Sequence, residues 1–89
     1  MPYIDGPGRL KFQPFLDKLL ADLDYYGITP GELNYLFTIL SIQYVKRKGK
    51  SYTHMNDVIG ALEGAKLEFY RRMVAPYEDE KIEENGDVY

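Results

Sequence analysis

The sequence contains no cysteine and no tryptophan, and His54 is its single histidine. Without cysteine there is no disulfide framework, no thiolate nucleophile and no sulfur-ligated metal. Ser41 and Ser51 have no histidine at a spacing that suggests a catalytic pair, and no glycine-rich phosphate loop is present. We therefore predict a non-enzymatic protein with no catalytic residue, no metal site and no cofactor.

Long apolar runs are also missing. No stretch approaches the ~18 apolar residues of a membrane span, and the opening MPYIDGPGRL has no apolar secretory segment. Of the 89 residues, 45 % are hydrophobic, which is ordinary for one small globular domain. We expect a soluble, cytoplasmic, single-domain chain with no membrane partner.

Positive charge is scarce, with 11 Lys and Arg against 14 Asp and Glu, and the sequence pI is about 5.0. Six carboxylates and one lysine lie within residues 78–89. Duplex nucleic acid is therefore disfavoured as a partner, because binding to it rests on many cations. The nine tyrosines instead favour half-wet contact surfaces, since tyrosine is enriched at protein interfaces.

Two helices are predicted in the first half of the chain. Apolar residues share one helical face over residues 14–26, with Pro14 in the first turn and Gly27 beyond the last. Residues 1–13 are expected to form an extended lead-in, with a short helical turn over 9–12 as an option. A capping box, Thr29-Pro30-Gly31-Glu32, begins the second helix.

The second helix is expected to end in the cations Lys46, Arg47 and Lys48, with Gly49 closing it. Cations in a last turn complement the helix dipole. A patch that contacts phosphate is the alternative interpretation of the same residues.

Residues 53–75 carry the longest helical pattern, with Thr53 as the expected N-cap, and this pattern has two apolar stripes. The first stripe consists of Met55, Val58, Ile59, Leu62, Ala65, Phe69 and Met73. The second, the glycine stripe, consists of Gly60, Gly64, Leu67, Arg71 and Val74. A helix that is apolar on two sides is expected to be covered on two sides.

Gly60 and Gly64 each cost about 0.8–1 kcal/mol relative to alanine inside a helix. A line without side chains permits close approach by another backbone or a flat ligand. Three occupants remain open: another part of the same chain (the first helix or the tail), a second subunit, and a small molecule.

Glu68 lies three and four residues before Arg71 and Arg72, the spacing of a surface ion pair on a helix. The alternative is that Arg71, which shares the glycine stripe, clamps a carboxylate or phosphate. Pro76 is expected to end or kink the long helix. Beyond it, residues 76–89 form the C-terminal arm, with a short helix over 77–84 and a stop at Asn85-Gly86.

The predicted fold is all-α: a small three-helix domain over residues 1–89 with a short C-terminal helix or ordered arm. The stripes of the first two helices are expected to bury against the third. We also predict a homo-oligomer, with Tyr77, Ile82 and Tyr89 of the arm docked. The expected interface residues are Gly60, Gly64, Leu67, Val74 and Tyr77.

The segments TPGELNY and NDVIGALEGAKLEFYRR, and the ending MVAPYEDEKIEENGDVY, resemble a family of proteins of about 90 residues from tailed phages and viral metagenomes. The resemblance covers residues 29–89. The family has no assigned activity, so the resemblance implies only a setting: a phage accessory protein in the host bacterial cytoplasm. Small oligomeric phage proteins of that kind often antagonise host defence, and some sequester nucleotide signals.

Two functional hypotheses follow. In the first, the oligomer binds an anionic small molecule, a nucleotide of host defence, through cations and stacking tyrosines. The ligand-binding residues would be Tyr35, Asn56, Tyr70, Arg71, Arg72 and Lys81. In the second, the protein is an interaction or virion-associated module whose acidic arm engages a basic protein.

Overall fold

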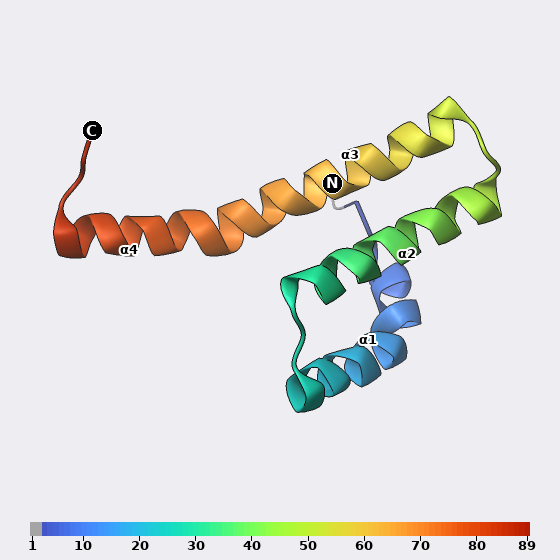
Figure 1. Cartoon of the computed structure of the whole chain (residues 1–89), viewed down its shortest axis with the longest axis horizontal. Helices are drawn as coiled ribbons and strands as arrows, with labels where there is room; N and C mark the ends of the chain where they lie inside the picture. Colours follow the sequence, from blue (N-terminus) through green and yellow to red (C-terminus); the bar gives the residue numbers. More distant parts are fainter. Residues whose placement is uncertain (1–2) are drawn as a thin grey trace. The chain divides into compact units, whose positions relative to one another are not determined.

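The computed structural model describes residues 3–89, and this part of the chain contains helices and short connections but no strand (Figure 1). The prediction of an all-α fold is confirmed. The elements are α1 (Gly6–Tyr26), α2 (Pro30–Lys48), α3 (Tyr52–Phe69), a π-helical turn η1 (Tyr70–Val74) and α4 (Ala75–Asn85). They divide into two units, residues 1–37 and 38–89, each described by itself below.

Helix α1 begins at Gly6, so the predicted extended lead-in over residues 1–13 is wrong from residue 6 onward; residues 1 and 2 lie outside the described part. The carboxylate of Asp5 caps the helix by accepting a hydrogen bond of 2.8 Å from the backbone N–H of Gly8. Pro7 sits in the first turn, where a missing N–H costs little. Pro14 lies inside the helix rather than at its start, and its ring is on the exposed side.

The capping box that begins α2 is confirmed. The backbone N–H of Thr29 donates to Glu32 Oε1 at 2.9 Å, and the backbone N–H of Glu32 donates to Thr29 Oγ1 at 3.1 Å. The prediction that Gly27 and Gly49 end the first two helices is also confirmed. Gly27 and Gly49 have φ values of 73° and 107°, and their N–H groups bond the carbonyls of Leu23 and Val45.

Helix α3 begins two residues earlier than predicted. Its cap is Ser51, whose hydroxyl accepts a hydrogen bond of 3.1 Å from the backbone N–H of His54. Thr53 is therefore inside the helix and is not the cap. The sequence S-Y-T offers a hydroxyl at either position, and the extended backbone at Ser51 selects the first one.

The long helix does not end at Pro76. It passes through the π turn η1 into α4, so α3, η1 and α4 run as one continuous rod (Figure 1). The N–H of Ala75 bonds the carbonyl of Tyr70, five residues back, which is the wider spacing of a π-helix. This turn directly precedes Pro76, where the ring would crowd a regular α-helical turn. The rod stops at Gly86, whose φ is 87°.

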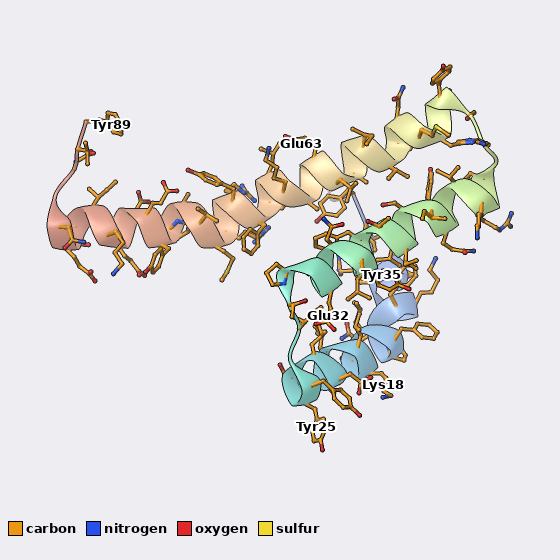
Figure 2. The ribbon with its side chains drawn as sticks, in the orientation of Figure 1. Lys18, Tyr25, Glu32, Tyr35, Glu63 and Tyr89 are labelled. Carbon is orange, nitrogen blue, oxygen red and sulfur yellow. The ribbon has the colours of Figure 1, made fainter. Side chains whose placement is uncertain are left out.

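No residue in the described part of the chain is buried. In α1, Leu10 and Phe15 are each 72 % exposed, and in the rod Ile59 and Phe69 are 65 % and 60 % exposed. Neither unit by itself forms the predicted core, in which the apolar stripes of the first two helices are buried against α3. The side chains of the rod instead stand off the ribbon on several sides (Figure 2).

The two hydroxyls at the start of α3 provide a matched test of the cap. Ser51→Ala is expected to lower the free energy of unfolding by about 1 kcal/mol, because the N–H of His54 loses its acceptor. Thr53→Ala is expected to cost nothing, since alanine has the higher helix propensity. Chemical denaturation of both variants measures the difference, and an equal or larger loss in Thr53→Ala would contradict this cap.

Candidate functional site

The residues predicted to bind a ligand are not gathered at one place in the chain. Tyr35 projects from α2 and belongs to the first unit, whereas the other five residues lie on the rod (Figure 2). Along the rod, Asn56 precedes Arg71 by fifteen residues, a separation of about 22 Å at 1.5 Å per residue. One chain therefore does not bring Asn56 and the arginines to a common pocket, and the ligand-binding role of these residues stays a prediction.

Arg71 and Arg72 both pair with Glu68. Glu68 Oε2 lies 2.9 Å from Arg72 Nε and 3.6 Å from Arg71 Nη2. The hydrogen bond from Arg72, reinforced by the positive charge of both guanidinium groups, lowers the pKa of the Glu68 carboxyl from its usual value. The ion pair predicted from the spacing is thus present, while the side chains of the two arginines remain 71 % and 69 % exposed.

Tyr70 and Lys81 also have partners within the rod. The Tyr70 hydroxyl donates to the Glu78 carboxylate, with both oxygens at 3.2 Å, and this bond raises the pKa of Tyr70. It links the π turn to α4. Lys81 Nζ lies 3.2 Å from Glu84 Oε2 and 5.3 Å from the centre of the Tyr77 ring.

The glycine stripe is open in the single chain. A methyl group added at Gly60 or Gly64 would meet nothing within 4 Å. Leu67 and Tyr77 are also exposed, and Val74 is half-buried. The chain's own tail does not lie in the stripe, because α4 continues the rod away from it (Figure 1).

The C-terminal arm does not dock on its own unit. Tyr77, Ile82 and Tyr89 are all exposed, and Tyr89 stands at the end of the tail beyond α4 (Figure 2). The prediction that these side chains dock left open whether they do so on their own chain or on a neighbouring copy. They do not dock within their own unit, and docking on another copy stays a prediction. The tail and one face of α4 do frame a shallow hollow, lined in part by Tyr77, Lys81 and Ile82.

A groove of about 700 Å³ between α2 and α3 was not predicted. Its apolar lining comes from Ile42 and Val45 of α2 and from Met55, Val58 and Ile59 of α3. Lys46 and Lys50 also line it.

A side-chain hydrogen bond connects α2 and α3 beside this groove. Tyr44 Oη donates to Asp57 Oδ2 at 3.0 Å, and this bond raises the pKa of Tyr44. At the closed end of the hairpin, His54 Nδ1 lies 2.7 Å from the carbonyl oxygen of Gly49. The apolar spacing of Ile42 and Val45, followed by that of Met55 and Ile59, was the available sequence signal for a shared groove.

Neither an ion site nor a membrane span appears between residues 3 and 89. No three His, Asp or Glu side chains there are grouped so that they could hold a metal ion. None of the helices in the same range is long and apolar enough to cross a bilayer.

The chain matches, over residues 1–88, a family described as "Domain of unknown function (DUF6899)". It belongs to that family. No curated protein and no solved structure matches the chain. Membership in DUF6899 agrees with a resemblance to a family without assigned activity, and it assigns no reaction to the residues above.

The Glu68 ion pair predicts a pH dependence of known sign. Because the folded pKa of Glu68 is lowered, the pair stabilises the fold above the usual glutamate pKa near 4.5, and this contribution is lost as the pH falls through the folded pKa. Titration of the side-chain carboxyl by NMR should place the Glu68 pKa below that value. Arg72→Gln should move it upward, and a pKa that does not move would contradict the pairing.

Lys66→Gln is the matched control for that titration. Lys66 also sits on α3 and pairs with a carboxylate, Glu63, at 3.6 Å. Its loss removes one positive charge from the same helix but no contact to Glu68. The Glu68 pKa should therefore stay where it is in this variant.

Proposed function

We propose that this chain is a non-enzymatic accessory protein that works by association, and that its first partner is a second copy of itself. The observation that supports the proposal is that no described residue is buried, although the helices carry several apolar stripes. In proteins most of the stability of a helix comes from packing its apolar face against other elements rather than from helix propensity. Uncovered apolar surface of this kind is typical of a protein–protein interface.

The amino-acid types that remain exposed support an interface more than a catalytic site. Tyrosine, phenylalanine and methionine are enriched at interfaces, and several lie open along the rod. Examples from α3, η1 and α4 are Phe69, Tyr70, Met73 and Tyr77. A closed two-fold dimer is the commonest way for identical chains to cover such surface.

The mass of the purified protein in solution tests the proposal. Light scattering after size exclusion, at tens of micromolar, should give a multiple of the 10.3 kDa chain mass. Dilution should return the protein toward the chain mass with a parallel loss of helical circular dichroism, because packing sustains the helices. A helical monomer across that concentration range would overturn the proposal.

The glycine stripe gives a second test, in which alanine either destabilises the assembly or stabilises the helix. If a partner covers the stripe, Gly60→Ala/Gly64→Ala should weaken the assembly, because the added methyl groups hold the partner off. If the stripe faces water, the same change should stabilise the helix by about 0.8–1 kcal/mol per glycine. We expect the first outcome, measured by light scattering and thermal melting.

Gly31→Ala is the control for that pair. Gly31 also lies in a helix, and a methyl group there would meet only Thr29 Oγ1 at 3.9 Å, an ordinary contact. This variant should keep the mass of the wild type and should melt at the same temperature or higher. A loss of assembly in Gly31→Ala would show that the assay responds to glycine replacement in general.

Binding of a nucleotide is the second candidate function. The resemblance to phage proteins supports it, because it implies a setting in the bacterial cytoplasm, where some such proteins sequester nucleotides. Two largely exposed guanidinium groups on neighbouring residues, Arg71 and Arg72, are the feature that favours it. Because Asn56 lies far from them along the rod, different copies would have to complete the site.

Mass spectrometry of the denatured protein, before and after incubation with cyclic dinucleotides, tests nucleotide binding. On this hypothesis the wild type should release a bound nucleotide and should melt at a higher temperature in its presence. Arg71→Gln/Arg72→Gln should do neither. No released nucleotide and no thermal shift with the wild type would leave protein association as the function.

A further inference from the structure

The groove between α2 and α3 has the features of a binding site for an amphipathic helix. Its apolar residues include Ile42 and Val45 on one wall and Ile59 on the other, and Ile59 is 65 % exposed. Lys46 and Lys50 are also among the residues that line the groove, so positive charge accompanies this apolar surface. Helices bind such grooves through a few apolar anchors, and charges at the rim select the partner.

The C-terminal arm carries the complementary chemistry. Tyr77 and Ile82 of α4, and Val88 and Tyr89 of the tail, are exposed apolar side chains. Around them the arm has six carboxylate side chains and one lysine, a net side-chain charge of −5. The groove therefore combines apolar side chains with two lysines, whereas the arm combines apolar side chains with carboxylates.

The arm cannot enter the groove of its own chain. The rod α3–η1–α4 is continuous, so α4 lies farther along the same axis as the wall of the groove (Figure 1). Ile82 follows Ile59 by 23 residues, which corresponds to about 35 Å along the rod. The distance is fixed by backbone hydrogen bonds, including the one from Ala75 to Tyr70 in the π turn.

We infer that the C-terminal arm of one copy occupies the α2–α3 groove of a second copy, with the arm carboxylates against Lys46 and Lys50. This inference rests on the proposed self-association and names the surfaces that carry it. Each copy has one arm and one groove. If each arm occupies the groove of the other copy, both grooves are filled and the dimer is closed. Two rods lying antiparallel place the arm end of each beside the groove end of the other.

A charge-swap pair tests this arrangement in the full-length chain. The groove variant is Lys46→Glu/Lys50→Glu, and the arm variant is Glu80→Lys/Glu83→Lys. Each variant alone sets like charges against each other at both contacts of a dimer, so its dissociation constant should rise at least about tenfold. An equal mixture restores opposite charges at both contacts, and light scattering should show assembly again at wild-type concentrations.

Lys11→Glu/Lys18→Glu is the control. It changes the net charge as much as the groove variant does, but both positions lie in α1. Because Lys18 pairs with Asp22 at 2.9 Å, the control is used only if its helical circular dichroism matches that of the wild type. It should assemble as the wild type does, and a matching loss in this control would overturn the inference, because net charge alone would then explain the effect. If the groove variant loses its helical circular dichroism, Lys46→Gln/Lys50→Gln replaces it, with an expected weakening of at least about threefold.

The outcomes separate this inference from the proposed function. A monomeric wild type overturns both. An oligomeric wild type whose groove and arm variants assemble unchanged, or whose mixture does not recover, overturns the arm-in-groove contact and leaves self-association standing. In that case the groove is open to a different occupant, such as an acidic helix of another protein. Separate loss with recovery on mixing supports the contact.

Discussion

The constraint on which this fold depends is the cost of leaving apolar side chains in water. Four helical elements present apolar residues, and none of the described residues is buried within the chain. Burial contributes roughly 25 cal/mol for each Å² of apolar surface. Helices in proteins derive most of their stability from such packing. The local hydrogen bonds, caps and surface ion pairs fix where each helix begins and ends. They do not replace the missing core, and for this reason association with a further chain is central to the function we propose.

The π turn before Pro76 allows α3 and α4 to run on as one rod in the second unit. A proline in a regular helix removes a hydrogen bond and crowds the preceding turn, so Pro76 could have folded the arm back onto α3. Instead the helix widens into the π turn η1 just before the proline, and the helical backbone continues. The hydrogen bond from Tyr70 to Glu78 connects this turn to α4. The rod that results separates the acidic arm from the apolar groove at its other end. The same geometry places Asn56 far along the rod from Arg71 and Arg72.

Local rules predicted much of this structure. The Thr29 and Glu32 capping box, the closing glycines at Gly27 and Gly49, and the pairing of Glu68 with the arginines all depend on residues within four positions of each other. Errors arose where two local rules competed. Glycine and proline before residue 9 indicated an extended segment, but the Asp5 cap starts a helix there. Ser51 and Thr53 were both suitable caps, and only backbone conformation distinguishes them.

The sequence by itself determined the helical class, most helix ends and the contrast between an acidic arm and a cationic end of α2, because these properties follow from short-range hydrogen bonding and composition. Only the tertiary structure decided that α2 and α3 share a groove, that the rod continues past Pro76, and that the glycine stripe stays open within one chain. Those features depend on how elements pack and on the direction in which the chain leaves each turn. No pattern within a single helix records either property.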